Sequence, residues 1–199
     1  MFFSIIILII LIYLTVNSSK IKGAKGEKRV NLILKDIPNS KVLNDIMLKT
    51  QMGTSQIDHI LINSKGIFVI ETKNYDGWIF GNEKSKYWTQ IIYKKKSKFL
   101  NPIRQNYGHI KAIEEYLPNK KEMFHSTIVF SNKCEFKKLE VITHVLKVRE
   151  LKKFLNEFKS NITLTNADIN YYFMILQKNN ITDEVERKKH IKRIRESNT

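Results

Sequence analysis

The sequence predicts an α/β protein in which helices flank a mixed β-sheet and one N-terminal transmembrane helix precedes them. Three observations support this class. The chain starts with an uncharged apolar run, several later segments have the apolar alternation of strands, and apolar residues recur at helical spacing before, between and after those segments. The predicted order after the apolar run is α-β-β-β-β-α-β-β-α-α.

Composition limits the class of protein further. The chain has 199 residues, 42% of them hydrophobic and 27% charged, which fits one ordinary domain with an appendage and excludes a disordered polymer. Its one cysteine, Cys134, excludes an internal disulfide and those zinc sites that need several thiolates. The net charge of +16 favours a polyanionic partner, either nucleic acid or an acidic membrane surface, over a lysine-rich surface that is merely solvated.

Residues 2–16 form the apolar run and contain no charged residue. The run is slightly shorter than the ~17–25 residues of a usual helical span, and three polar residues after it extend the helix towards the headgroups. Lys20, Lys22 and Lys25 follow, so the positive-inside rule places the soluble domain in the cytoplasm. No basic residue precedes the run, which favours a single-pass anchor of the cell membrane at residues 1–19 over a cleaved signal peptide.

The first half of the chain divides into one helix and several strands. A helix is predicted over residues 20–37, because four apolar residues form one face: Val30, Ile33, Leu34 and Ile37. Pro38 ends this helix. Three strands follow between turn residues, at 41–48, 55–63 and 66–74. Two more segments have the pattern of a hairpin, 78–80 and 87–93, with residues 94–98 as its exposed continuation.

The second half begins with a helix from Pro102 to Leu117, which Asn101 caps. Two short apolar strands follow, at 125–130 and 141–146. Three helical segments complete the chain: 148–158, a helix to about Lys178 with Thr165 and Asp168 as its capping box, and a charged tail from Thr182. The protein is thus predicted to have three parts: a membrane anchor at 1–19, a core domain at 20–146, and C-terminal helices with a basic tail at 147–199.

One predicted hairpin brings charged residues together. Its strands read QIDHILI and IFVIETK, and side chains alternate between the two faces of each strand. If the two residues after Asn63 form the turn, Asp58 lies directly opposite Glu71, and Gln56 lies opposite Lys73. A three-residue loop would shift this register by one residue and break the alignment.

Two carboxylates directly opposite each other repel and destabilise a sheet, so a positive charge is expected beside Asp58 and Glu71. A divalent cation fits best, because Mg²⁺ prefers oxygen ligands and keeps several waters; Mn²⁺ is the alternative ion. Lys73 would then orient a water molecule or help to deprotonate it, and Gln56 would position water or a phosphate oxygen. The other interpretation is a surface salt bridge with Lys73, worth ~0–1 kcal/mol. The apolar strands around these charges favour the metal site, because buried polar groups are costly.

The chain resembles a known family at these residues. Asp58 followed by Glu71-Thr72-Lys73 is similar to the D…(D/E)-x-K signature of the restriction-endonuclease-like nucleases, the PD-(D/E)xK superfamily. Five segments occur in an order that resembles the nuclease-related domain (NERD) family: KGAKGE (22–27), QIDH (56–59), GIFVIETKN (66–74), GWI (77–79) and NPIRQN (101–106). The resemblance covers roughly residues 20–130 and implies a restriction-endonuclease-like mixed sheet with a DNA-processing activity.

The resemblance also implies roles for single residues. Asp58 and Glu71 match the metal-binding acids, and Lys73 matches the catalytic lysine. Glu27 matches an acid on the first helix that in related folds contacts the metal or its water; the alternative is an ordinary glutamate on a helix surface. Gln105 resembles a glutamine that is followed four positions later by tyrosine in related nucleases, whereas this chain has His109 there.

The remaining candidates have ordinary structural interpretations. His59 points away from Asp58 and is expected to be a packed or hydrogen-bonded structural residue. Trp78 and Trp88 are expected to pack against the sheet, with base stacking as the alternative. Asp45 is a further acid, and its distance from the site depends on a register that the sequence leaves open. Four histidines show no spacing of metal ligands: His109, His125, His144 and His190.

Lysines and aromatic residues are interleaved after the predicted hairpin, in the segment YKKKSKF at 93–99. Such interleaving is typical of surfaces that bind a nucleic-acid backbone, although a solvated hairpin tip would have the same composition. The predicted nucleic-acid contacts are Lys94, Lys95, Lys96 and Lys98, together with Gln105.

These observations predict a membrane-anchored, Mg²⁺-dependent nuclease-like enzyme that faces the cytoplasm and hydrolyses phosphodiester bonds of DNA. Lys73, Gln56 and Glu27 are the expected catalytic residues, and Asp58 and Glu71 are the expected metal ligands. The alternatives are a non-catalytic nucleic-acid-binding tether and a scaffold for a membrane complex whose basic surface contacts lipids. The intact set of acids and lysine favours the enzyme, since a binding protein has no need of opposed acids.

Overall fold

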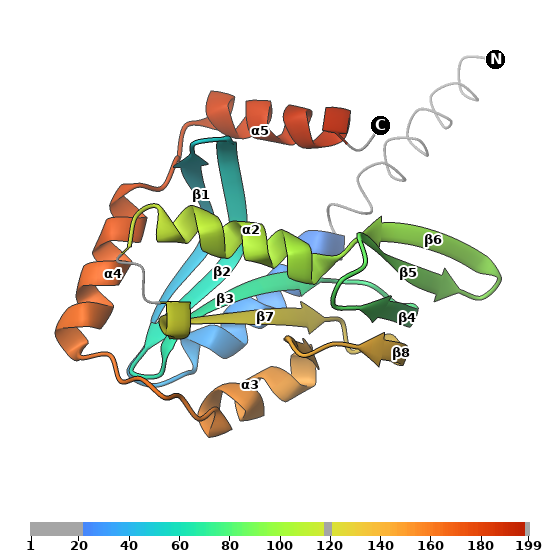
Figure 1. Ribbon diagram of the computed structural model, residues 1–199, viewed down its shortest axis with the longest axis horizontal. Coiled ribbons are helices and arrows are strands. Elements are labelled where there is room, and N and C mark those ends of the chain that lie inside the picture. The colour runs from blue at the N-terminus through green and yellow to red at the C-terminus, as the bar shows by residue number, and fades with distance from the viewer. Residues whose placement is uncertain (1–21, 118–120, 198–199) are drawn as a thin grey trace, which may run out of the picture.

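The computed structural model describes residues 22–117 and 121–197 of the chain. The predicted membrane anchor at residues 1–19, with its apolar run at 2–16, lies outside these ranges. Among the described residues, no helix is long and apolar enough to cross a membrane. The described chain is a mixed α/β structure with two sheets and helices packed around them (Figure 1).

The larger sheet has five strands in the order β1-β2-β3-β7-β9. These strands are β1 (Lys41–Thr50), β2 (Gly53–Asn63), β3 (Gly66–Lys73), β7 (Phe124–Phe130) and β9 (His144–Lys147). β1, β2 and β3 are antiparallel neighbours, whereas β7 and β9 continue the sheet parallel to β3. The first six residues of the central strand β3 are buried, which explains why it reads as a nearly continuous apolar run.

The smaller sheet has four strands in the order β6-β5-β4-β8. These strands are β4 (Gly77–Asn82), β5 (Tyr87–Ile92), β6 (Lys95–Leu100) and β8 (Cys134–Glu140). The predicted α/β class is confirmed, but the prediction of one mixed sheet is wrong because the chain forms two. Apolar alternation identifies a strand without identifying its partner, and β4, which begins at Gly77 with a φ of 77°, pairs with β5 and β8 rather than with β3.

Two strands of the smaller sheet differ from the sequence-based prediction. Residues expected to be an exposed continuation of the hairpin form β6, which pairs antiparallel with β5 after a turn in which Tyr93 has a φ of 53°. β8 was not predicted, and the strand predicted at 141–146 begins only at His144. β6 and β8 are the two edges of this sheet, and both are rich in lysine. Lysine on an edge strand opposes further pairing, and it also hides the apolar alternation that predicts a strand.

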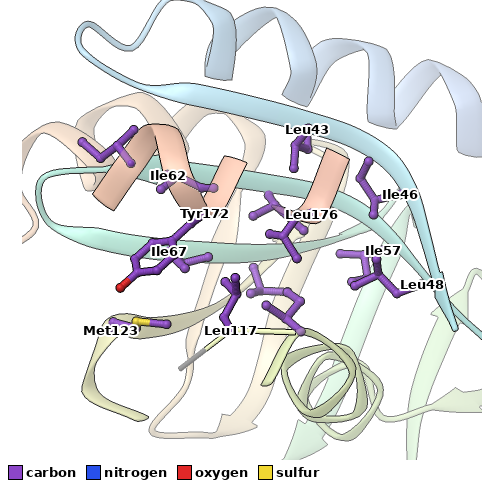
Figure 2. Packing of buried hydrophobic residues seen from close by; sticks show 14 of the residues in the cluster. Leu43, Ile46, Leu48, Ile57, Ile62, Ile67, Leu117, Met123, Tyr172 and Leu176 are labelled. Carbon is purple, nitrogen blue, oxygen red and sulfur yellow. The ribbon is translucent and has the colours of Figure 1, made fainter. Parts of the chain in front are cut away.

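Helices cover both faces of the five-stranded sheet (Figure 1). The helix at residues 22–35 and α3 (Val148–Glu157) pack on one face, and α2 (Pro102–Glu114) and α4 (Asn166–Lys178) pack on the other. Figure 2 shows the second of these interfaces, in which Ile57, Ile62 and Ile67 of the sheet meet Tyr172 and Leu176 of α4. Burial of each such aliphatic side chain contributes about 1.5–3 kcal/mol, so both layers hold the strands firmly.

The local signals for the helices are confirmed. Val30, Leu34 and Ile37 of the predicted apolar face are buried. The side chain of Asn101 caps α2, and Thr165 caps α4 in the predicted capping box with Asp168.

The remaining helical elements are η1 (Lys121–Met123), which precedes β7, and α5 (Glu184–Ser197). The Thr54 hydroxyl on β2 lies 2.8 Å from His190 Nδ1 of α5, so the last helix lies beside the β1–β2 turn (Figure 1).

Candidate active site

A cleft of about 1150 Å³ opens where β2 and β3 approach α2. Four residues predicted for the site and two predicted nucleic-acid contacts line it: Glu27, Gln56, Asp58 and Lys73, with Lys98 and Gln105. Glu71 lies beneath this lining with 2% of its surface exposed. Lys94, Lys95 and Lys96 are exposed and do not line the cleft. The structure therefore brings together the predicted acids and the lysine of the D…(D/E)-x-K pattern.

The predicted hairpin register is confirmed where the main chains pair. The ladder between β2 and β3 runs from Asn63–Gly66 to His59–Ile70 and stops there. The prediction placed Asp58 directly opposite Glu71. Because the ladder ends one pair earlier, these two residues form no main-chain pair. The side chain of Asp58 makes the contact instead, since its Oδ2 accepts a hydrogen bond of 2.8 Å from the main-chain N–H of Thr72.

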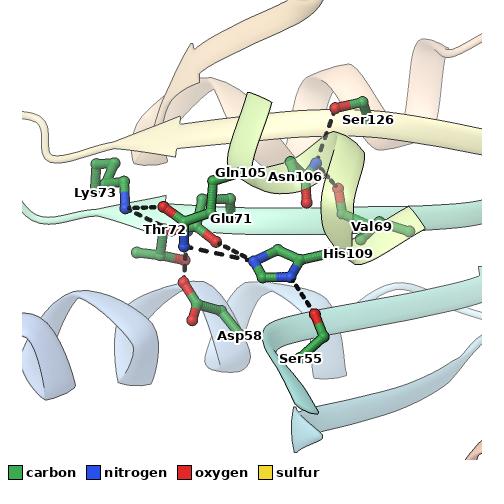
Figure 3. Close-up of polar contacts among 10 residues, drawn as sticks. All are labelled: Ser55, Asp58, Val69, Glu71, Thr72, Lys73, Gln105, Asn106, His109 and Ser126. Carbon is green, nitrogen blue, oxygen red and sulfur yellow. Dashed lines mark hydrogen bonds and ion pairs between the residues drawn. The ribbon is translucent and has the colours of Figure 1, made fainter. Parts of the chain in front are cut away.

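Glu71 is held as a buried anion between two donors (Figure 3). Lys73 Nζ lies 2.6 Å from Glu71 Oε1, and His109 Nε2 lies 3.2 Å from Glu71 Oε2. Burial raises the pKa of Glu71, but the ammonium of Lys73 and the hydrogen bond from His109 outweigh it and hold that pKa below its ordinary value. The salt bridge with Lys73, which was the alternative to the predicted metal site, is therefore present, and it is buried rather than on the surface.

Lys73 also donates a hydrogen bond of 2.9 Å from Nζ to Gln105 Oε1. Burial lowers the pKa of Lys73, but the adjacent Glu71 carboxylate raises it by more, so that the net shift is upward. The ammonium is therefore retained near neutral pH. In this arrangement Lys73 is suited to orienting groups and stabilising negative charge, and unsuited to removing a proton.

His109 is a site residue that the sequence analysis did not select. A carboxylate only accepts hydrogen bonds, so His109 donates to Glu71 through Nε2. Its other ring nitrogen, Nδ1, lies 2.8 Å from Ser55 Oγ, so the ring also contacts β2 (Figure 3). The available signal was the spacing: His109 follows Gln105 by four residues, which puts both on one face of α2.

Asp58 lies in a different electrostatic environment from Glu71. Its pKa is raised well above the ordinary value, first by burial and then by the negative charge of Glu71, while the hydrogen bond from Thr72 opposes this shift. Two neighbouring carboxyl groups whose pKa values are shifted in opposite directions are typical of acid–base sites.

Glu27 reaches the site because its helix lies close to the end of β3. A Cβ added to Gly26 would lie 2.8 Å from Asn74 Cβ, so glycine permits this approach. Asn74 also donates a hydrogen bond to the main-chain oxygen of Lys22. Burial raises the pKa of Glu27, and the charges of Asp45 and Glu71 raise it further. Glu27 thus lies in the electrostatic field of Asp45 and Glu71, while the contact with a metal or its water that the resemblance implied stays a prediction.

The predicted position of Gln56 opposite Lys73 is wrong, because the hairpin ladder ends before it. Gln56 instead pairs with Met47 on β1, and its Nε2 donates a hydrogen bond of 2.6 Å to Asp45 Oδ1. Asp45 has a φ of 51° and forms an ion pair with Arg187 of α5. Gln56 therefore lines the cleft but contacts a different acid from the one expected.

The segment NPIRQN places α2 over the site. Asn101 accepts a hydrogen bond of 2.9 Å from the N–H of Ile103 and donates to three main-chain oxygens in the loop at 82–85. Asn106 is fully buried, and its Nδ2 donates to Val69 O and Ser126 Oγ, both at 2.8 Å. These contacts fix the helix against β3 and β7, so that Gln105 and His109 face Glu71.

The other candidates have structural roles or lie at the surface. His59 is buried opposite Ile70 and contacts Asn44 Oδ1 at 2.7 Å, which confirms its structural role. Trp88 is fully buried, as predicted, whereas Trp78 is 48% exposed with Lys137 over its ring, so its predicted packing is wrong.

The residues present are compatible with a hard divalent cation. Among the residues described, no group of three or more His, Cys, Asp or Glu side chains is arranged around a common metal position. Asp58 and Glu71 nevertheless supply carboxylate oxygens, and Mg²⁺ is commonly bound through one or two carboxylates plus water. Each oxygen of Glu71 has one partner and a second lone pair, so the contacts with Lys73 and His109 leave it able to act as a ligand.

A profile of the nuclease-related domain matches residues 22–131 of the chain. The chain belongs to the NERD family. This confirms the resemblance, and with it the place of the chain in the restriction-endonuclease-like superfamily. An uncharacterized protein of Bacillus anthracis is 42% identical to the chain over 179 residues, which are 87% of this chain and 84% of that protein. No solved structure matches the chain.

Proposed function

We propose that this NERD protein is a membrane-anchored, metal-dependent nuclease-like enzyme that hydrolyses phosphodiester bonds of DNA. One observation carries the proposal: Asp58, Glu71 and Lys73 converge at the floor of one cleft, with Gln105 bonded to the lysine. A binding protein has no need for a buried carboxylate between two donors beside a second carboxyl group with a raised pKa.

The proposed fold of the five-stranded sheet is restriction-endonuclease-like. It is supported by the order β1-β2-β3-β7-β9, by helices on both faces, and by acids on the neighbouring strands β2 and β3. Family membership supports the same assignment.

Asp58 and Glu71 would hold Mg²⁺, or Mn²⁺, with water as further ligands. The cation would supply Lewis-acid stabilisation of the charge that develops on the phosphate. Lys73, kept as an ammonium by Glu71, would stabilise that charge from a second side. Gln105 fixes the direction of the lysine through its hydrogen bond to Nζ. Glu27 and Gln56, which line the same cleft, would position water or a phosphate oxygen.

The proposed location is the inner side of the cell membrane, anchored through residues 2–16. The uncharged run and the lysines that follow it support this topology. Protease added to intact cells should leave the domain uncut, and N-terminal sequencing should recover residues that precede Ser19. A mature protein that starts near Ser19 and is found outside the cell would exclude the anchor.

The test of the reaction is cleavage of DNA by the purified full-length chain in mild detergent. Supercoiled plasmid and linear DNA are incubated with Mg²⁺, with Mn²⁺ or with chelator, and products are separated on gels. We expect metal-dependent cleavage that Lys73→Ala and Asp58→Asn abolish, and that Lys178→Ala, an exposed lysine of α4, leaves unchanged. DNA binding without cleavage under every metal condition would contradict the enzyme and favour a non-catalytic tether.

A further inference from the structure

The wall of the cleft that β5 and β6 form has an exposed apolar surface. Tyr87 and Leu100 lie opposite each other in the β5–β6 ladder and line the cleft. They are 46% and 42% exposed. The packing of the small sheet does not require them, because Trp88 and Phe99, on the opposite face of the same two strands, contact its core. The exposed pair is therefore available to a ligand in the cleft.

Lysines continue this surface along β6. The ladder pairs Thr89 with Lys98 and Ile91 with Lys96, so both lysines lie on the same face of the ribbon as Tyr87. Residues two apart on a strand are roughly 7 Å apart, which suits contacts with successive phosphates of an extended strand. Lys86 Nζ also lies 5.3 Å from the centre of the Tyr87 ring. An aromatic ring beside cations is typical of surfaces that bind unpaired bases.

The α5 side of the cleft does not offer the same combination. Three lysines of α5 are each paired with a glutamate of the same helix: Lys188 with Glu184, Lys189 with Glu186, and Lys192 with Glu196. The cleft residue on that helix, His190, is 6% exposed and contacts Thr54. Of these two sides, the β5–β6 side therefore offers the better binding surface.

The buried position of the acids and lysine favours an unpaired strand over a duplex in the cleft. The side chains of Glu71 and Lys73 are only 2% and 16% exposed. In a duplex the bases are stacked on one another, so an aromatic ring such as Tyr87 cannot contact a base face unless the strand is open. A strand that leaves its duplex can enter the cleft, place a base on the ring and bring its phosphate to the floor.

We propose that the β5–β6 wall binds an unpaired nucleic-acid strand, with a base stacked on Tyr87 and phosphates on Lys96 and Lys98, and presents it to the acids of the cleft. The substrate class of this protein is then a single strand, or the unpaired part of a larger nucleic acid. The presentation of the strand to the acids rests on the proposed function. The binding of the strand by the β5–β6 wall does not depend on that function.

Fluorescence anisotropy tests the binding part. The full-length chain in mild detergent is titrated into a labelled single-stranded DNA, the same strand in a duplex, and a single-stranded RNA of the same sequence. Chelator is present throughout, so no cleavage interferes. We expect the single strands to bind at least tenfold more tightly than the duplex, and the DNA and RNA arms identify the preferred sugar. Equal affinity for single strand and duplex would overturn the proposal.

Three variants locate the surface. Tyr87→Ala should weaken single-strand binding by about tenfold or more, and Tyr87→Phe, which keeps the ring, should bind within twofold of the wild type. Tyr93→Ala is the matched control, because Tyr93 is 96% exposed at the β5–β6 turn and does not line the cleft. It should bind as the wild type does. Equal losses in Tyr87→Ala and Tyr93→Ala would overturn the assignment to the cleft wall.

Cleavage assays keep this inference separate from the proposed function. If single strands bind through Tyr87 and no substrate is cut with any metal, the proposed reaction fails and the binding surface stands. If duplex DNA is cut equally well by the wild type and Tyr87→Ala, the reaction stands and the inference fails.

Discussion

His109 Nε2 lies 3.2 Å from Glu71 Oε2, and this contact joins the face of α2 to the buried carboxylate on β3. The same ring contacts Ser55 on β2 through Nδ1. Glu71 is thereby fixed by residues from two strands and a helix. A carboxylate held in this way has its direction fixed before any ligand binds.

His109→Phe should keep the shape of α2 and remove the second donor to Glu71. We expect cleavage to fall by about 10–100-fold, the usual cost of losing a residue that orients a ligand. His109→Gln, which retains an N–H donor, should recover part of this loss. The measurement is kcat and KM for all three proteins, with their melting temperatures as the control for folding. Equal activity of His109→Phe and wild type would exclude the positioning role.

Glu71→Gln tests the ion pair and the metal site together. Because the replacement leaves Lys73 without its buried partner, the metal-free variant should lose roughly 3 kcal/mol of folding free energy. Divalent metal should raise the melting temperature of the wild type by mass action, and that of the variant much less. Glu140→Gln, at an exposed ion pair with Lys138, is the matched control and should change stability by ~0–1 kcal/mol.

Melting curves with chelator and with Mg²⁺ or Mn²⁺ decide this prediction. If divalent metal raised the melting temperatures of wild type and Glu71→Gln equally, the cation would bind elsewhere. This expectation differs from that for two bare opposed carboxylates, in which removing one charge would stabilise the metal-free protein. The difference arises because Lys73 and His109 already compensate the charge of Glu71.

Asn106→Ala should destabilise the protein by about 1–3 kcal/mol, because it leaves the buried oxygen of Val69 and the half-buried hydroxyl of Ser126 without their donor. Asn170→Ala, at an exposed position of α4, should have little effect. Urea unfolding followed by circular dichroism measures both. A loss in Asn106→Ala no greater than in Asn170→Ala would show that the amide does not hold α2 on the sheet.

His125 should make stability depend on pH. Its ring packs against Phe68 and Phe158, and burial lowers its pKa below the ordinary value of 6.5, helped by the nearby His144 and opposed by a hydrogen bond to Lys65 O. The unfolded chain then takes up the proton at a higher pH than the folded one. Stability is therefore complete above about pH 6.5 and falls as the pH drops through that value.

Melting temperatures between neutral pH and pH 5 measure this dependence. His125→Gln should have a shallower decline, whatever its absolute stability, because the group that titrates has been removed. An unchanged slope in this variant would assign the acid sensitivity to other groups.

The lysines of β6 and of the turn before it should differ in how much each contributes to the salt dependence of nucleic-acid binding. Log K falls with log salt by about 0.7 per phosphate neutralised on a single strand. Replacing Lys96 and Lys98 together by Ser should therefore reduce that slope by roughly 1.4. Replacing Lys94 and Lys95 together by Ser is the matched control and should change the slope less. Lys94 lies in the turn, and Lys95 faces away from the Tyr87 side of the ribbon. Binding that does not vary with salt in the wild type would argue against any phosphate surface.

The sequence by itself determined the features that depend on residues close together in the chain. The register of the β2–β3 hairpin follows from a two-residue turn and the alternation on both sides of it, and the structure has that register as far as His59–Ile70. The caps at Asn101 and Thr165 are likewise local hydrogen bonds. The pattern Asp58…Glu71-Thr72-Lys73 was visible for the same reason, since the turn between its strands brings these residues to one end of a hairpin.

Only the tertiary structure decided what packs across the site. Ser55 and His109 are 54 positions apart in the chain, and they meet because Asn106 and an apolar face hold α2 over the sheet. The partner of Gln56 depends on the register between β1 and β2, which places Met47 opposite Gln56 and brings Asp45 within reach of its side chain. The division into two sheets has the same origin, because pairing between distant strands depends on how their side chains fit against helices and neighbouring strands rather than on the pattern within each strand.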